Sequence, residues 1–148
     1  MNIRQISVFI ENKYGKLSEI LALLGKGNIR IFAATVADTS EYGILRLIVT
    51  APEEAYKILK NNNVSANLTD VFAVVTDSSA GNIAQTLKYF TQSGISIEYM
   101  YCFSLKDKSI LTLRTHNCEA AREVIRRHNL DYINENDLII LTNNKKNE

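Results

Sequence analysis

Hydrophobic and polar positions alternate along the chain with two different periods, and the order of these stretches predicts its elements. Residues 6–10 alternate between apolar and more polar side chains, as in a β-strand, and the turn-forming run 12–15 follows. From Leu17 to Leu24 the apolar residues recur at helical spacing, and this helix is expected to close at Gly25 and Gly27. The chain therefore opens with a strand, a turn and a helix.

A hairpin and a second helix are predicted next. Residues 29–37 and 44–49 return to a period of two on either side of a tight polar turn, which predicts paired strands. Pro52 suits the first position of a helix, and residues 55–59 supply its apolar stripe. A short strand over residues 64–68 completes this first set of elements.

The chain repeats this pattern after a fixed shift of 66 residues, without gaps, over about residues 15–64. The matched positions include Gly15 with Gly81, Leu21 with Leu87, Ile29 with Ile95, Leu47 with Leu113 and Ala55 with Ala121. The second copy therefore has its own helix, hairpin and second helix, the last capped by Asn117. Each copy reads strand, helix, strand, strand, helix, strand, so we predict an α+β protein of two ferredoxin-like (βαββαβ) units, with helices on one face of antiparallel strands.

The ends of the two copies set the expected domain boundaries. Asp70 is expected to separate the last strand of the first copy from the opening strand of the second, Val71–Thr76. The run Asp137–Leu141 predicts an extra strand that extends or closes a sheet. The expected division is unit 1 over 1–70, unit 2 over 71–142 and a polar tail over 143–148.

Composition and charge exclude several classes of protein. Hydrophobic residues make up 46% of the 148 residues, which provides for a packed core, and 17 Lys and Arg face 16 Asp and Glu. A net charge of +1 gives no field that would attract nucleic acid or an anionic membrane, so neither is an expected partner. The first residues do not resemble a signal peptide, and a cytoplasmic location is expected.

Chemistry-bearing residues are few. Cys102 and Cys118 lack a CxxC pair or a histidine at ligand spacing, so they are expected to be core thiols and not a disulfide or a metal site. His116 and His128 are expected on the surface near helix ends. Because no catalytic or phosphate-binding motif occurs, the sequence predicts neither an enzyme nor a cofactor.

One loop carries a resemblance to a known family. A strand ends at Asn12, Gly15 follows at a helix start, and the next strand is entered through Gly27, Asn28 and Ile29. This arrangement resembles the ACT domain, whose loop usually reads Asn-x-Pro-Gly-x-Leu; Tyr14 stands in the place of the proline here, as Ala80 does in the weaker second copy. Nearly the whole chain is similar to small stand-alone tandem ACT proteins without a catalytic domain.

The resemblance implies regulation by a free amino acid. ACT units commonly pair side by side into a continuous eight-stranded sheet and hold the ligand at the seam. Independently, a turn that feeds a helix N-terminus offers free N–H groups and partial positive charge, which suit an α-carboxylate. Arg30 is expected to grip a carboxylate and Asp77 an ammonium group. The candidate ligand-binding residues are Asn12, Tyr14, Gly15, Arg30, Asp77, Ser78, Ala80, Gly81, Ser96, Tyr99 and Tyr101.

Ligand preference and partners follow from the same resemblance. Glu98, Tyr99 and Tyr101 lie where a seam would place them, and a tyrosine wall favours a flat side chain, so an aromatic amino acid or histidine is preferred. A second copy of the chain and a regulated enzyme are the expected protein partners. The ligand would lock the relative orientation of the units, which a partner then reads.

Other interpretations stay open at this stage. Asn12 and Gly15 also suit a plain turn, Ser78 and Ser79 a helix cap, and the tyrosines ordinary sheet packing. The alternative functions are an RNA-binding module, which has the same element order, and a protein-interaction module without a ligand. The aliphatic residues 44–49 lack the aromatic pattern that RNA-recognition strands carry, which disfavours the first of these.

Overall fold

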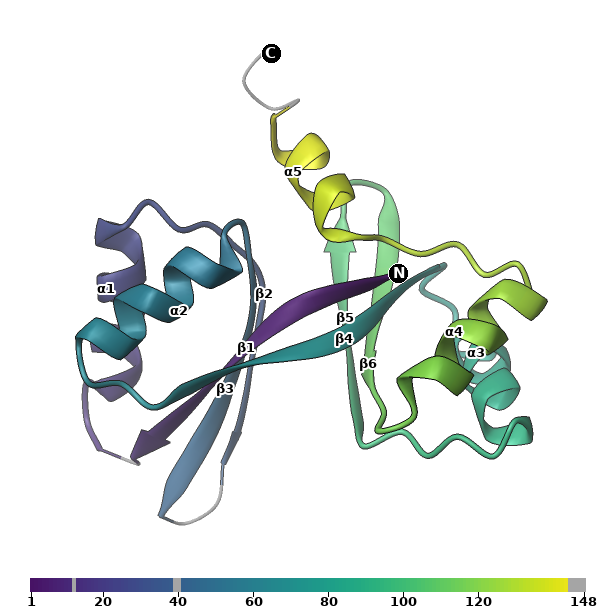
Figure 1. Ribbon diagram of the computed structural model, residues 1–148, viewed down its shortest axis with the longest axis horizontal. Helices are drawn as coiled ribbons and strands as arrows, with labels where there is room; N and C mark the ends of the chain where they lie inside the picture. Colours follow the sequence, from purple (N-terminus) through teal and green to yellow (C-terminus); the bar gives the residue numbers. More distant parts are fainter. Residues whose placement is uncertain (12, 39–40, 144–148) are drawn as a thin grey trace. The chain divides into compact units, whose positions relative to one another are not determined.

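The computed structural model describes residues 1–11, 13–38 and 41–143. These residues form six strands and five helices, in an order that repeats from the first copy to the second (Figure 1). The elements are β1 (Asn2–Glu11), α1 (Lys16–Lys26), β2 (Ile31–Asp38), β3 (Tyr42–Val49), α2 (Pro52–Asn61), β4 (Ala66–Thr76), α3 (Ala80–Gln92), β5 (Tyr99–Leu105), β6 (Lys108–Arg114), α4 (Cys118–Arg127) and α5 (Glu135–Asn143).

The chain divides into two compact units, the first Arg4–Thr69 and the second Met1–Ile3 with Asp70–Glu148. In the first unit the strands neighbour one another in the order β2-β3-β1-β4. In the second the order is β5-β6-β4, and a single bridge from Val74 to Tyr132 stands in the place of a fourth strand. Strand β3 pairs antiparallel with β1 and β2, and strand β6 pairs antiparallel with β4 and β5. The predicted ferredoxin-like order is therefore confirmed.

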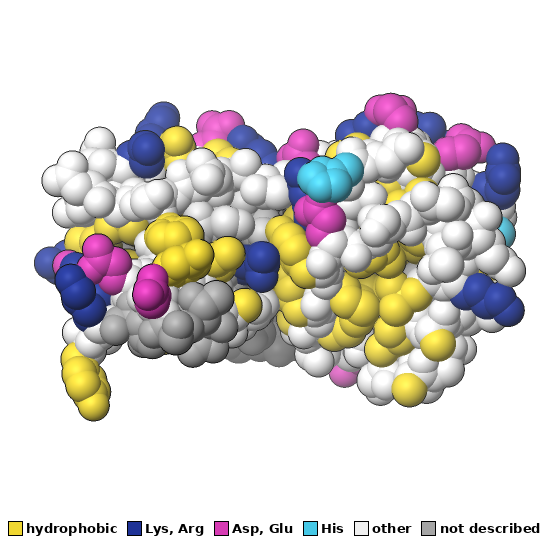
Figure 2. Space-filling model, turned by 90° about the horizontal axis from the view of Figure 1, so that it is seen from below, with side chains coloured by type: hydrophobic (Ala, Val, Ile, Leu, Met, Phe, Trp, Pro, Cys, Tyr) yellow, Lys and Arg dark blue, Asp and Glu magenta, His cyan; other side chains and the backbone are white. Residues whose placement is uncertain are grey.

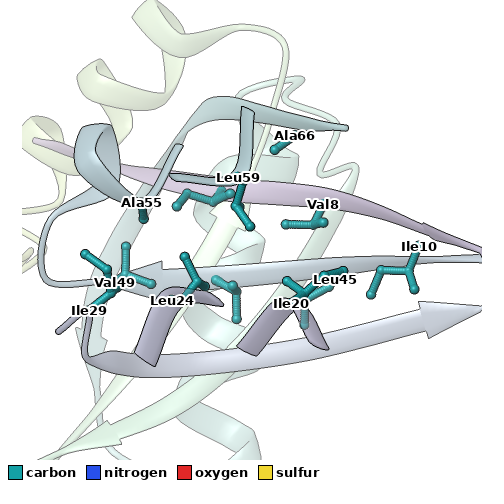
Figure 3. Packing of buried hydrophobic residues seen from close by; sticks show 12 residues of the cluster. Val8, Ile10, Ile20, Leu24, Ile29, Leu45, Val49, Ala55, Leu59 and Ala66 are labelled. Atoms are coloured by element: carbon teal, nitrogen blue, oxygen red, sulfur yellow. The ribbon is translucent and has the colours of Figure 1, made fainter. Parts of the chain in front are cut away.

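The core of the first unit lies between its strands and two helices. Helices α1 and α2 lie side by side on one face of the strands (Figure 1). Val8 and Leu45 point from the strands toward Leu24 of α1 and Leu59 of α2, and all four are buried (Figure 3). A close approach helps to set the helix packing, because a Cβ added at Gly27 would meet Ile58 Cδ1 at 2.4 Å.

The second unit repeats this packing with different residues. Phe72 and Val74 of β4 and Leu113 of β6 pack under Phe90 of α3 and Val124 of α4, and all five are buried. Asn117 begins α4 as predicted, because its Oδ1 accepts the N–H of Ala120 at 3.1 Å. The matching apolar positions of the two copies therefore build matching cores.

Two element predictions were wrong. The predicted break at Asp70 does not occur, because β4 runs without interruption from Ala66 to Thr76. The predicted strand Asp137–Leu141 lies inside helix α5. Asn134 and Asp137 cap this helix reciprocally: the Asn134 N–H donates to Asp137 Oδ2 at 2.9 Å, and the Asp137 N–H donates to Asn134 Oδ1 at 3.0 Å. A capping box of this kind fixes a helix start whatever the β-propensity of the residues that follow.

The prediction of a core thiol was wrong for Cys102, which is exposed. Cys118 is half-buried and packs against the core of the second unit. Cys102 lies on β5, at the edge of the strand order in its unit, where every second side chain of that strand is exposed. Partial desolvation still raises the pKa of the Cys102 thiol, which disfavours a reactive thiolate.

Candidate functional site

The turn before α1 presents an unusual helix start. Gly15 occupies the N-cap position with φ 78° and provides no side-chain cap, and its carbonyl accepts the N–H of Glu19 at 2.9 Å. The backbone N–H groups of Leu17 and Ser18 have no acceptor within the part of the chain that the structure describes. This end of α1 therefore offers N–H donors and the positive end of a helix dipole.

Two predicted ligand contacts of the first copy are exposed but lie apart. Tyr14 is fully exposed in this turn, and Arg30 is exposed at the entrance of β2, at the opposite end of the strands. Backbone bonds hold Arg30 in place: its N–H donates to Thr50 Oγ1 at 3.1 Å, and its carbonyl accepts the Thr50 N–H at 3.0 Å. The Arg30 guanidinium has no ion-pair partner among the described residues. Asn12, the first predicted ligand contact, lies outside the described residues.

Carboxylates near α1 are already paired with lysines. Lys13 Nζ lies 2.7 Å from Glu11 Oε2, and this hydrogen bond lowers the pKa of Glu11 and raises that of Lys13. Lys16 Nζ lies 3.6 Å from Glu19 Oε2. The two lysines therefore offset the negative charge beside the first turn of α1.

The equivalent start of α3 is capped by its own side chains. The Ser79 N–H donates to Asp77 Oδ1 at 2.8 Å, Asn82 Nδ2 donates to Asp77 Oδ2, and the Asn82 N–H donates to Ser79 Oγ at 3.2 Å. The hydrogen bond from the Ser79 backbone, and after it those from the Ser79 and Asn82 side chains, lower the pKa of Asp77. The contact of Asn82, five residues beyond Asp77, was not predicted, although an Asx residue followed by a serine is a helix-start signal.

The other predicted residues of the second copy fall into two groups. The first group is exposed: it comprises Ser78, Ala80 and Gly81 beside the capped turn, and Ser96 in the segment before β5. Tyr99 and Tyr101 of β5 are half-buried and pair in register with Arg114 and Thr112 of β6. Thr112 is fully buried.

Glu98 belongs to a charge cluster that sequence reasoning missed. Its carboxylate accepts from His116 Nε2 and lies 3.5 Å from Arg114 Nε. Arg114 also donates from Nη1 to the carbonyl of Asp70 at 2.8 Å. Only the hairpin register brings these residues together, so no local spacing in the sequence signals the cluster. Glu98 is thus engaged by both Arg114 and His116.

The two histidines have different surroundings. His116 is exposed as predicted, whereas His128 is half-buried and stacks on Tyr89 with ring centroids 3.9 Å apart. Within residues 1–11, 13–38 and 41–143, no group of three or more His, Cys, Asp or Glu side chains is placed to hold a metal ion. None of the helices described has the length and apolar character needed to span a membrane.

Surface charge agrees with the near-neutral composition. On the face shown in Figure 2, positive and negative side chains are interspersed, and neither sign forms a continuous field. Nucleic-acid binding needs a patch of positive charge along the phosphate backbone, and this face lacks one.

Comparisons with known proteins agree with this geometry. A family model described as an ACT domain pair matches residues 1–142. The crystal structure of protein BT0572 from Bacteroides thetaiotaomicron is 36% identical, with a TM-score of 0.88 over 94% of this chain and 96% of that one. No curated protein matches the chain.

More distant structures share the fold. The regulatory subunit of aspartate kinase from Thermus thermophilus, in a ligand-free form, is 15% identical with a TM-score of 0.62 over 84% of this chain and 91% of that one. The aspartokinase alpha and beta subunits give 16% identity and a TM-score of 0.57 over 84% and 90% of the two chains. These two comparisons establish the fold alone.

Proposed function

Because the chain belongs to the ACT domain pair family, we propose that it binds a free amino acid and acts as a regulatory sensor, not as an enzyme. The ligand lies at a seam between ACT units, as the family resemblance implies. Its carboxylate is held by the N–H groups at the start of α1 and by Arg30 of a second copy of the chain, and its ammonium by polar side chains of the neighbouring turn. A regulated enzyme or a second copy of the chain reads the liganded state.

The helix start of α1 carries this proposal. Gly15 provides no side-chain cap there, whereas Asp77 and Ser79 cap the equivalent helix α3. The N–H donors and the helix dipole at this start suit one carboxylate. The exposed guanidinium of Arg30, whose backbone is bonded to Thr50, lies at the opposite end of the strands of its own unit, so it joins this carboxylate from a second copy of the chain.

Regulation follows from where the ligand contacts the chain. The turn before α1 follows the end of β1, whereas residue 30 leads into β2 at the opposite end of the strands, so one ligand held by both bridges two copies of the chain. A ligand that binds one conformation of the protein more tightly than another shifts the population toward that conformation. A partner that recognises this conformation is then regulated through a coupling free energy.

A thermal-shift screen of the full chain against the twenty amino acids tests the proposal. At about 100 times its Kd a ligand adds about 2.7 kcal/mol of stability, which raises the Tm by about 5–10 °C for a chain of this size. A selective rise is expected, largest for aromatic amino acids or histidine. No rise with any of the twenty at tens of millimolar would overturn the amino-acid proposal.

Two variants locate the site by calorimetric titration of the amino acid that the screen selects. Asn12→Ala should weaken binding about 2- to 10-fold and Arg30→Ala about 10-fold or more, in line with a lost neutral and a lost charged hydrogen bond. Arg30→Ala should cost more for an acidic amino acid than for a neutral one. Asn67→Ala and Arg126→Ala, at exposed positions, are the matched controls. Equal affinities in all four variants would place the site elsewhere.

A further inference from the structure

The second unit contains a cavity that the proposed site does not use. It has a volume of about 550 Å³ and lies by the hairpin that joins β5 to β6, next to the first turns of α5. All of its lining residues belong to the second unit, between Val75 and Ile140. The cavity is therefore a property of that unit by itself.

Charges of both signs line this cavity. Lys106, Asp107 and Lys108 come from the hairpin, Asp131 from the connection after α4, and Asp137 from α5. Among the described residues, the two lysines, Asp107 and Asp131 have no ion-pair or side-chain hydrogen-bond partner. Asp137 is engaged through the cap to Asn134. Two cations and two carboxylates thus line the cavity without a partner.

The rest of the lining is apolar. Val75 of β4 is half-buried and Ile133 is buried, whereas Tyr132 and Ile140 remain 40% and 58% exposed. An isoleucine and a tyrosine that stay this exposed around a cavity offer surface that a ligand with an apolar body would cover. A small inorganic ion would leave this surface in water.

Volume and charge together select the ligand class. Space of about 550 Å³ corresponds to about 18 water molecules at about 30 Å³ each. A single leucine has about half that number of non-hydrogen atoms, whereas a dipeptide such as Leu-Leu has about 17, within the usual range for pockets of this size. A dipeptide also carries a carboxylate and an ammonium group at separate ends, with apolar side chains between them.

We propose that this cavity binds a zwitterionic dipeptide with apolar side chains, whose carboxylate pairs with Lys106 and Lys108 and whose ammonium pairs with Asp131. This binding does not depend on the proposed amino-acid site, because none of the residues named there lines the cavity. The protein would then report on the products of peptide breakdown as well as on a free amino acid.

Calorimetric titration of the full chain with Leu-Leu, N-acetyl-Leu-Leu and Leu-Leu amide tests the proposal. Saturable binding of Leu-Leu is expected, and each blocked peptide should bind about tenfold or more weakly, because one charge-assisted hydrogen bond is lost. Absence of saturable Leu-Leu binding, or equal binding of all three peptides, would overturn the proposal.

Charge variants assign each end of the peptide by a double-mutant cycle. Lys108→Gln should weaken the binding of Leu-Leu about tenfold but leave the affinity for Leu-Leu amide unchanged. Asp131→Asn should likewise weaken the binding of Leu-Leu about tenfold but leave the affinity for N-acetyl-Leu-Leu unchanged. Lys88→Gln, an exposed position of α3, is the matched control. If Asn12→Ala abolishes Leu-Leu binding while Lys108→Gln does not, the peptide occupies the amino-acid site and the inference is wrong.

Discussion

Replacement of two equivalent glycines by alanine should change stability in opposite directions. Gly15 and Gly81 match in the internal repeat, and a Cβ added at either position meets no atom within 4 Å. Their backbones differ, because Gly15 has φ 78° at the N-cap of α1 whereas Gly81 lies inside α3 without a positive φ. Any difference between the two variants therefore reports backbone conformation and not crowding.

The magnitude follows from two terms. Both replacements reduce the freedom of the unfolded chain equally, which stabilises the fold by about 0.4–1 kcal/mol where the backbone conformation is ordinary. At Gly15 the left-handed conformation costs an L-residue about 1–2 kcal/mol. Gly81→Ala should therefore stabilise the protein, Gly15→Ala should destabilise it or leave it unchanged, and their free energies of unfolding should differ by about 1–2 kcal/mol.

Urea unfolding of both variants and the parent chain measures this difference, with equal m-values as the check that the unfolded states are alike. The expected Tm gap between the two variants is about 2–8 °C. Gly94→Ala is the matched control, since Gly94 also has a positive φ, 71°, and open space for a Cβ, so it should behave like Gly15→Ala. If Gly15→Ala proves as stable as Gly81→Ala, the assigned backbone of the α1 start is wrong.

Three further outcomes are expected from the same unfolding assay. Leu138→Ala should cost about 2–3 kcal/mol because Leu138 is buried, whereas Ile140→Ala should change stability by less than about 0.5 kcal/mol because Ile140 is 58% exposed; a strand over these residues would put both on one face and make the costs similar. Asn117→Ala should lower stability by about 1 kcal/mol through loss of the α4 cap, and an unchanged midpoint would contradict the cap. Asp77→Asn should destabilise the protein at neutral pH, with a difference that disappears in acid: the fold lowers the pKa of Asp77 below its ordinary value of 3.8, so its contribution is present above that value and is lost as the pH falls through the lower, folded value. A difference that persists at every pH would refute the role of the carboxylate charge.

The repeat made most of the fold predictable. Two copies of one hydrophobic pattern, with a period of two for strands and a helical period between them, leave few arrangements other than paired ferredoxin-like units. Pro52 and Asn117 marked helix starts in sequence, and both helices begin where these residues indicate. Local signals of this kind need no knowledge of distant contacts.

The errors have identifiable physical causes. Residues 137–141 are aliphatic enough for a strand, but the pair Asn134 and Asp137 carries a capping signal that outweighs this propensity. Asp70 was expected to interrupt a strand, yet a single aspartate is tolerated there because its side chain is exposed. Exposure of Cys102 depends on the position of β5 at an edge, which only the strand order reveals.

The candidate site was less predictable than the fold. Turn residues such as Gly15 and Asp77 could be identified, but whether a helix start is free or capped depends on side chains that fold back onto it. The cluster around Glu98 and the cavity beside Lys106 depend on hairpin register and on helix α5, which no local pattern encodes.

The two copies share a fold but not the chemistry of their first helices, and this bears on the number of ligands. At α3 an external carboxylate would meet Asp77, whose lowered pKa keeps it charged and whose oxygens already accept N–H groups of the turn. At α1 the acidic side chains Glu11 and Glu19 are paired with lysines. Electrostatics therefore favours a carboxylate at the first copy only. We expect one amino acid per chain, and a titration that saturates at two would contradict this assignment.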